Sequence, residues 1–200
     1  MGQVSYAAYV NEITEDCWRR AGIGAGMRVL DAGCGSGEST FLAARLVGPD
    51  GYVVGLDRDH NAIRLARRAA DERWIENLEF REGDGQQASL LGEAPFDAVV
   101  GRYFLVHQDD PASVLRKLSR LVRPGGVVAF LEEELEYGHR SEPSSPALSL
   151  AVDRRQAADR ESGRHLHMVT GFARFFLEAG LGWPDTRAYQ AALGGAASDA

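Results

Sequence analysis

Residues 28–40 read RVLDAGCGSGEST, and this stretch decides the fold. Its first four residues form a short strand-like run that leads directly into a turn with a glycine at every second position. These glycines are Gly33, Gly35 and Gly37. Glycines in such a turn let the backbone approach a ligand closely, and a helix that opens at Glu38 leaves its first N–H groups free for an anion. The stretch therefore predicts a strand, a ligand-binding turn and a helix, in that order.

A second strand, expected over residues 52–57 (YVVGLD), ends in an acid that lies 20 positions after Gly37. In nucleotide-binding α/β folds a carboxylate at this point faces a ribose diol. A dinucleotide is disfavoured, because Glu38 stands where the third glycine of G-x-G-x-x-G would fall when counted from Gly33. A P-loop is excluded, since no Gly-Lys-Ser/Thr follows the turn. The turn and Asp57 together predict a nucleotide-type cofactor.

Three further strand-like runs complete the expected sheet, and amphipathic stretches of helical length separate the runs. They lie at residues 78–82, 96–101 and 127–132. The first of these alternates apolar and polar residues, which places it at a sheet edge. Repeated units of this kind predict a Rossmann-like α/β fold, with a doubly wound, mostly parallel sheet and helices on both faces.

Helix signals fit between these strands and beyond them. Helices are expected over residues 5–21, 61–72, 147–162 and 169–179. One more is expected with Asp109 or Asp110 as its cap and Pro111 at its first position. Pro124-Gly125-Gly126 is expected to stop the chain before the fifth strand. Residues 186–191 are a candidate sixth strand, and residues 133–170 form a polar lid or acceptor region.

Composition limits the class of protein. The 200 residues are 44% apolar and 26% charged, which indicates a single globular domain over residues 1–200. The formal net charge of −7 has the wrong sign for a phosphate backbone, so we expect no nucleic-acid partner. Two cysteines are too few for a disulfide framework, and neither an export signal nor a stretch of membrane-spanning length is visible. We therefore expect a cytoplasmic protein without a membrane partner.

Four ordered motifs resemble those of the class I S-adenosylmethionine-dependent methyltransferases, in particular the small-molecule branch related to ubiquinone and menaquinone biosynthesis. They are VLDAGCGSG at 29–37, GLDRD at 55–59, EGDGQ at 82–86, and FDAVVGRYFLVHQDDP at 96–111 followed by LVRPGGVVAFLE at 121–132. The resemblance covers roughly residues 6–181. It implies S-adenosylmethionine as the cofactor and methyl transfer to a small organic acceptor at O, N or C.

The resemblance also implies which residues lie at the cofactor. They are Asp31, Gly33, Gly35 and Gly37 in the first motif, Asp57 and Arg58 in the second, Asp84 and Gly85 in the third, and Arg102 after the fourth strand. The glycines would pass the methionine portion, and Asp57 would hold the ribose hydroxyls with Arg58 beside the adenine. Asp84 would accept from the adenine amino group, and Gly85 would contact the ring edge.

Histidines supply the remaining candidates. His107 lies beyond the fourth strand on the expected acceptor side, where it either takes a proton from a hydroxyl acceptor or hydrogen-bonds locally and orients its loop. His165 and His167 are two positions apart, unlike ligands spaced i, i+4 on a helix, and neither His139 nor the nearby glutamates fix a third ligand. We therefore expect no metal site.

The chain departs from the family pattern in two places. GRYF at 101–104 stands where amino-group nucleic-acid methylators carry Asn/Asp-Pro-Pro-aromatic, which favours a small-molecule acceptor. The family's sheet has seven strands and ends in an antiparallel hairpin, whereas one candidate strand follows the fifth here, so a shortened hairpin is expected. Either an open edge remains beside the fifth strand or a second copy covers it as a homodimer. The shortening also keeps a second function open, a cofactor-binding regulatory or assembly protein without methyl transfer.

Overall fold

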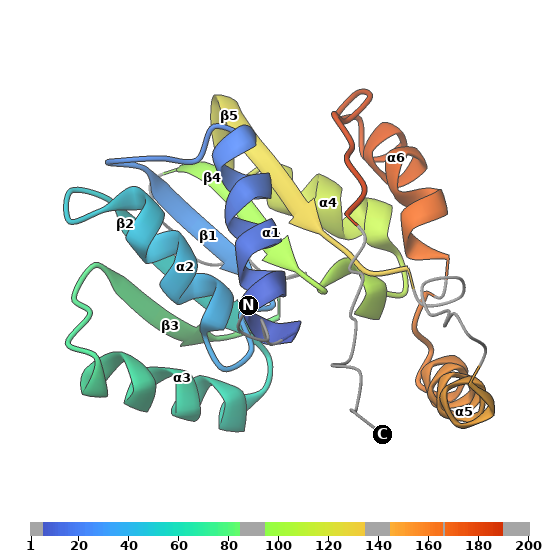
Figure 1. Cartoon of the computed structure of the whole chain (residues 1–200). Helices are drawn as coiled ribbons and strands as arrows, with labels where there is room; N and C mark the ends of the chain where they lie inside the picture. Colours follow the sequence, from blue (N-terminus) through green and yellow to red (C-terminus); the bar gives the residue numbers. More distant parts are fainter. Residues whose placement is uncertain (1–5, 85–94, 135–144, 166, 190–200) are drawn as a thin grey trace, which may run out of the picture.

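The computed structural model describes residues 6–84, 95–134, 145–165 and 167–189. In this part of the chain five parallel strands form one sheet in the order β3-β2-β1-β4-β5, with helices around it (Figure 1). The elements are α1 (Tyr6–Arg20), β1 (Arg28–Ala32), α2 (Glu38–Val47), β2 (Tyr52–Asp57), α3 (His60–Glu72), β3 (Leu78–Glu82), β4 (Phe96–Arg102), the 3-10 helix η2 (Leu105–His107), α4 (Pro111–Ser119), β5 (Val122–Leu131), α5 (Pro146–Glu161) and α6 (Met168–Glu178). The expected Rossmann-like fold is confirmed.

Two hydrophobic layers cover the faces of the sheet. Helices α1, α2 and α3 pack on one face, where Trp18 of α1 is completely buried, and α4 and α6 pack on the other. Successive residues of β1 alternate between these layers, since Val29 points into the first and Leu30 into the second. Burial on both faces explains why the central strands are apolar throughout. The expectation that 78–82 lies at an edge is confirmed, because β3 ends the sheet.

Helix caps follow the sequence signals. The Asp110 carboxylate accepts from the backbone N–H of Ser113 at 2.9 Å, and Pro111 is the first residue of α4, as predicted. Helix α2 begins at Glu38, also as predicted, but its N-cap Gly37 has φ 95° and offers no side chain to the first turn. The N-terminal N–H groups of α2 are therefore left without a side-chain cap.

Two strand predictions at the fifth strand and beyond are wrong. The Pro124-Gly125-Gly126 segment does not stop the chain, because β5 already begins at Val122. The register with β4 shifts across this segment, from Phe96–Val122 to Ala98–Val127, and an irregular edge strand tolerates a proline.

The candidate sixth strand is not formed over its described residues. Residues 186–189 pair with no strand, and the Tyr189 hydroxyl donates instead to Asp16 Oδ2 on α1 at 2.7 Å. Residues 190 and 191 lie outside the described part of the chain. Within that part, β5 pairs only with β4 and its other edge is open.

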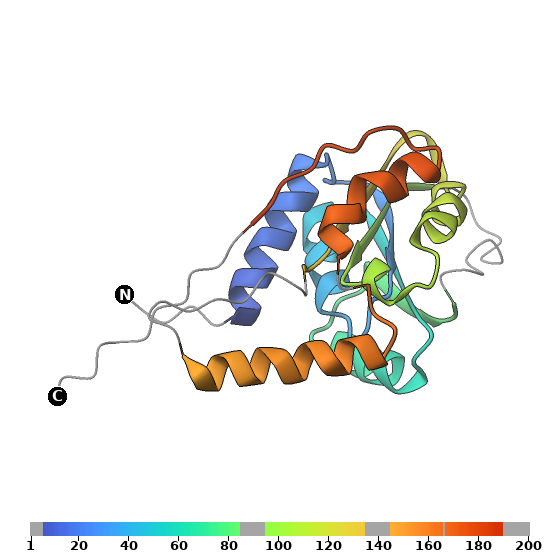
Figure 2. The ribbon, with the colours of Figure 1, turned by 90° about the vertical axis from the view of Figure 1, so that its right-hand side faces the viewer.

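Helix α5 stands apart from both helical layers, at the end of the sheet where the strands finish (Figure 2). Arg155 of α5 contacts Glu133, two residues beyond the last residue of β5, at 3.0 Å. The carboxyl ends of parallel strands are the usual ligand side of such folds, so α5 borders the expected site. None of the helices in the described ranges is long and apolar enough to cross a bilayer.

Candidate active site

The glycine turn after β1 forms the floor of the site. Gly33, Gly35 and Gly37 have positive φ values of 74°, 53° and 95°. A Cβ on Gly33 would lie 2.3 Å from the Phe104 ring, and one on Gly37 would lie 2.7 Å from the Phe80 ring. At Gly35 a Cβ would meet open space. Packing therefore requires glycine at the first and third positions, whereas the backbone at Gly35 is open to an incoming ligand.

Asp31 lies beneath this turn and is completely buried. Its Oδ2 accepts from Ser39 Oγ and Thr40 Oγ1, both at 2.7 Å, whereas Oδ1 has no hydrogen-bond partner among the described residues. Burial raises the pKa of Asp31, and the hydrogen bonds from Thr40 and Ser39 oppose this rise, as does the positive charge of Arg102 to a smaller extent. A buried acceptor without a donor is unfavourable, so Oδ1 suits a ligand that brings a donor, such as an ammonium group.

The uncapped N-terminus of α2 complements Asp31. Its first N–H groups face no side-chain oxygen at Gly37, and the helix dipole there favours a negative charge. A carboxylate acceptor and a helix N-terminus at the same turn match the two charges of an amino-acid group. The residues present therefore fit the methionine portion of S-adenosylmethionine.

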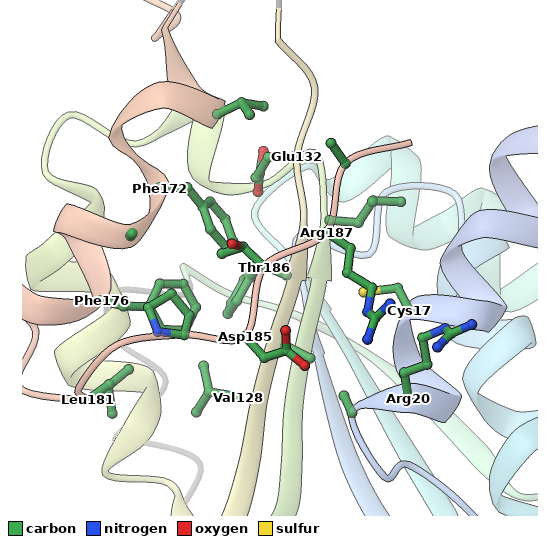
Figure 3. A pocket seen from close by; sticks show the side chains of 18 of the residues that line it. Cys17, Arg20, Val128, Glu132, Phe172, Phe176, Leu181, Asp185, Thr186 and Arg187 are labelled. Atoms are coloured by element: carbon green, nitrogen blue, oxygen red, sulfur yellow. The ribbon is translucent and has the colours of Figure 1, made fainter. Parts of the chain in front are cut away.

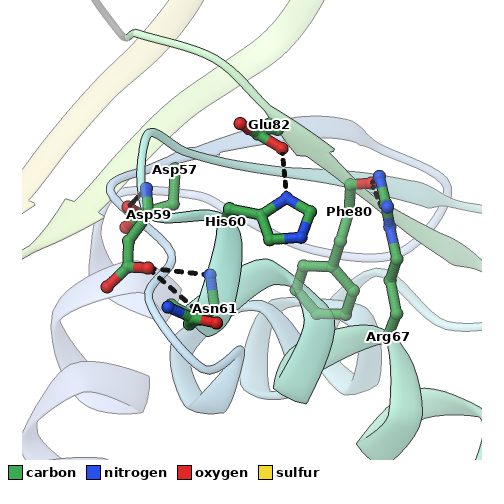
Figure 4. A network of polar contacts seen from close by, with 8 residues as sticks. Asp57, Asp59, His60, Asn61, Arg67, Phe80 and Glu82 are labelled. Carbon is green, nitrogen blue, oxygen red and sulfur yellow. Dashed lines mark hydrogen bonds and ion pairs between the residues drawn. The ribbon is translucent and has the colours of Figure 1, made fainter.

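Asp57 closes the other side of the turn. Its Oδ2 accepts from the Gly35 N–H at 2.8 Å. Its Oδ1 accepts from the Asp59 N–H at 2.9 Å (Figure 4). Each carboxylate oxygen has two lone pairs, so both retain capacity for a hydroxyl donor. Beside it, His60 Nδ1 contacts Glu82 Oε2 at 2.8 Å and links the start of α3 to the end of β3.

The other predicted cofactor residues are only partly placed. Asp84 follows β3 and is partly buried, and Gly85 lies outside the described residues. Arg58 is exposed directly after Asp57. Arg102 Nη1 donates to Asn11 Oδ1 of α1 at 2.7 Å, which ties the end of β4 to the N-terminal helix. The described residues of the set thus meet at the carboxyl edge of the sheet.

His107 ends η2 at the same edge. Burial lowers its pKa, as do the positive charges of Arg164 and Arg58, and the carboxylates of Asp159 and Asp57 oppose them. Its ring makes no hydrogen bond within the described ranges, and a lowered pKa favours the neutral imidazole that a base requires. Its predicted role as base or loop orienter stays a prediction.

Glu132, the residue after β5, holds the loop that carries His107. Its Oε1 accepts from the N–H groups of Phe104 at 3.1 Å and Leu105 at 2.8 Å, and its Oε2 accepts from Val106 at 3.3 Å. Burial raises the pKa of Glu132 to about 7, against these three bonds. The sequence predicts Glu132 only as the last residue of the expected strand at 127–132. The available signal was an acid that directly continues a buried apolar run.

Ion pairs fasten α5 to the site. Arg164 contacts Asp159 at 2.8 Å, and Arg155 contacts Asp159 at 3.6 Å and Glu133 at 3.0 Å. Asp159 is only 5% exposed, although it lies on an otherwise exposed helix. The described residues contain no group of three or more His, Cys, Asp or Glu side chains that could hold a metal ion. His139 lies outside those residues.

A cavity of about 700 Å³ lies away from the glycine turn, along the open edge of β5 (Figure 3). Phe172 and Phe176 of α6 form one wall, Cys17 and Arg20 of α1 form the other, and residues 185–187 cross between them. The two helical layers thus extend past the last strand and leave a space between them.

The fold and this site together define a class of protein. A doubly wound parallel sheet carries a glycine turn after its first strand, an acid after its second, and a buried carboxylate with a vacant acceptor position under the turn. These features define a nucleotide-cofactor domain of the class I methyltransferase type.

The chain belongs to the family described as "Methyltransferase domain", whose model matches residues 23–155. Membership confirms the resemblance seen in the sequence motifs and S-adenosylmethionine as the cofactor of this class.

Curated relatives carry names from quinone biosynthesis. A demethylmenaquinone methyltransferase of Lactococcus lactis subsp. lactis is 35% identical over 122 residues, which are 58% of this chain and 48% of that protein. A ubiquinone biosynthesis O-methyltransferase of Albidiferax ferrireducens is 39% identical over 106 residues, which are 53% of this chain and 41% of that protein. The chain spans about half the length of the curated relatives it matches.

Solved structures share the fold. A SAM-dependent methyltransferase from Aquifex aeolicus superposes with a TM-score of 0.64 at 18% identity and covers 84% of this chain and 78% of its own. The [4+2]-cyclase SpnF superposes with a TM-score of 0.59 at 23% identity, over 72% and 53%. At these identities the likeness establishes the fold alone.

Proposed function

We propose that this chain transfers the methyl group of S-adenosylmethionine to a small organic acceptor at O, N or C. The observation that carries the proposal is the pair of acids, Asp31 and Asp57, on either side of the open backbone at Gly35. The cofactor supplies a sulfonium-activated methyl group. Transfer is an in-line displacement, so the chain accelerates it mainly by aligning the acceptor with that methyl group.

The cofactor residues have separate roles in this proposal. Asp31 Oδ1 accepts from the ammonium group, and the α2 N-terminus binds the carboxylate. Asp57 accepts from the ribose hydroxyls. The remaining members of the set are Gly33, Gly35 and Gly37 under the methionine portion, Arg58, Asp84 and Gly85 at the adenine, and Arg102 at the end of β4.

The acceptor side is proposed to lie between the cofactor residues and α5, within residues 133–170 of a single domain. His107 takes a proton there when the acceptor is a hydroxyl. The quinone-biosynthesis names of the relatives support a small acceptor, and the net charge of −7 supports the absence of a nucleic-acid partner.

Two further proposals concern the environment of the chain. A second copy covers the open edge of β5 and forms a homodimer, because an unpaired strand edge beside a partly apolar cavity favours association. The compartment is the cytoplasm, supported by Cys17 and Cys34, which are both free.

Calorimetry with S-adenosylhomocysteine, the reaction product, tests the function. The wild-type chain is expected to bind S-adenosylhomocysteine at micromolar concentration and to show no binding of NAD. Asp57→Ala is expected to weaken binding by about 1.5 to 3 kcal/mol, roughly 10- to 150-fold, through the loss of charge-assisted hydrogen bonds. Asp71→Ala on the exposed face of α3 is the control and leaves affinity unchanged.

The outcomes separate the alternatives. Equal affinity of wild type and Asp57→Ala contradicts the cofactor assignment. A panel of small acceptors analysed by mass spectrometry then tests turnover, and a product heavier by one methylene unit supports the enzyme. Cofactor binding without any such product favours the regulatory or assembly protein instead.

A further inference from the structure

We infer that Glu132 is a positioning residue whose carboxylate fixes the 103–108 turn and thereby couples the glycine turn to α5. The inference rests on the proposed function, since it concerns the same site. Residues 103–108 follow β4 and contain η2, so this turn lies between the cofactor residues and the acceptor side.

Glu132 accepts the backbone hydrogen bonds that hold the 103–108 turn in place. Three consecutive N–H groups, those of residues 104, 105 and 106, donate to the one carboxylate at 3.1, 2.8 and 3.3 Å. Tyr103, just before them, has φ 56°, a conformation that a tyrosine rarely adopts. Its N–H donates to the Leu131 carbonyl at 2.8 Å, so β4 and β5 stay paired up to the residue before Glu132. The strained start of the turn is held in place from β5.

The turn contacts the glycine turn through Phe104. This ring fills the space in front of Gly33, where an added Cβ would lie 2.3 Å from it, and it stacks on Phe130 of β5 with centroids 6.2 Å apart. Any displacement of the residue 104 backbone moves this ring against Gly33. The position of Glu132 is therefore transmitted to the backbone that faces the cofactor.

The same turn contacts the segment after α5 through His165. The His165 N–H donates to the Val106 carbonyl at 3.0 Å, and its Nε2 lies 2.6 Å from the Gln108 carbonyl oxygen. Its neighbour Arg164 pairs with Asp159 of α5 at 2.8 Å. The Glu132 carboxylate thus supports a turn that contacts the glycine turn through Phe104. The same turn contacts His165, in the segment after α5, through the carbonyl groups of Val106 and Gln108.

The three hydrogen bonds require two acceptor oxygens at this position. A carboxylate offers two acceptor oxygens and charge-assisted bonds to all three N–H groups, whereas a glutamine amide presents its own NH₂ donors to one of them. Burial raises the pKa of Glu132 to about 7, and the three N–H groups oppose that rise.

The test compares Glu132→Gln with Asp97→Asn. Asp97 is a matched control, because its carboxylate also accepts from a backbone N–H, that of Arg28 at 2.7 Å, but at the opposite end of the sheet. In hydrogen exchange, Glu132→Gln is expected to speed exchange of the 104–106 amides about tenfold, the loss expected for these bonds. With S-adenosylhomocysteine, wild type gains protection at residues 103–108 and around His165. Glu132→Gln is expected to lose this ligand-induced protection around His165, whereas Asp97→Asn is expected to keep it.

A second measurement does not need the cofactor. In ¹⁵N spectra of the wild type, the amides of residues 104, 105 and 106 are expected to titrate together near pH 7, and this titration is lost in Glu132→Gln. A wild-type exchange pattern at residues 104–106 in Glu132→Gln overturns the inference. Failure of the wild type to bind S-adenosylhomocysteine while the amides still titrate contradicts the proposed function alone.

Discussion

The two sides of the sheet are built by different kinds of interaction. On the β1–β3 side, the glycine turn, Asp57 and the start of α3 lie within about 30 residues, and their hydrogen bonds join near neighbours in the fold. On the β5 side, the 103–108 turn is held by Glu132, and residues 184–189 reach back to Asp16 on α1. The first side is encoded in contiguous motifs, and the second by contacts between distant segments.

Substitutions in the glycine turn test the first side with the largest expected effect. Gly33→Ala places a Cβ 2.3 Å from the Phe104 ring at φ 74°, so it is expected to lower the free energy of unfolding by about 3 kcal/mol or more. Gly35→Ala meets open space and costs only about 1 kcal/mol, the conformational penalty at φ 53°. Urea denaturation measures both.

Cofactor affinity sharpens this contrast. Gly35→Ala, although stable, is expected to lose S-adenosylhomocysteine affinity in calorimetry by tenfold or so, because its methyl group occupies the open space at the turn. If Gly35→Ala binds as tightly as wild type, the ligand does not pass this backbone.

These contrasts show why the β1–β3 side was predictable. The glycine spacing and Asp57 each carry a local backbone requirement, and each was predicted from neighbouring residues alone. The different reasons for Gly33 and Gly35 were not, since they depend on Phe104, a residue about 70 positions away.

The β5 side escaped prediction for the same physical reason. Pro124 reads as a strand stop locally, but an edge strand accommodates it with a register shift. Residues 186–189 have strand character, yet Tyr189 bonds to Asp16 and the segment does not join the sheet. Glu132 gains its role only when three N–H groups from another strand end meet it.

Measurements of the free energy of unfolding at several pH values test the β5 side, where we expect the next largest effect. The unfolded chain releases the Glu132 proton near pH 4.5, whereas the folded chain keeps it to about pH 7. Glu132 therefore adds up to about 3 kcal/mol to the free energy of unfolding below pH 4.5, and this contribution is lost as the pH rises to 7.

Glu132→Gln does not titrate and isolates this contribution. Urea unfolding at pH 5 and pH 8 is expected to show a smaller decline for the variant than for wild type. Burial also raises the pKa of Asp31. Its contribution to the free energy of unfolding declines with pH in both proteins and therefore cancels in the comparison. Parallel declines would mean that Glu132 is already ionised at pH 5.

Substitutions in the ion pairs of α5 are expected to change the free energy of unfolding least. They test whether α5 is fastened to the β5 side of the sheet. Arg164→Ala leaves the buried Asp159 carboxylate with Arg155 at 3.6 Å, so it is expected to cost about 1 to 2 kcal/mol. Arg155→Ala leaves the shorter 2.8 Å pair with Arg164 intact and is expected to cost below about 1 kcal/mol, because this arginine is 44% exposed. Exchange at residues 146–161 rises more in Arg164→Ala, since Arg164 adjoins His165 and its bonds to the 103–108 turn. The reverse order of the two variants would mean that α5 is fastened through Glu133, beyond the end of β5, and not through that turn.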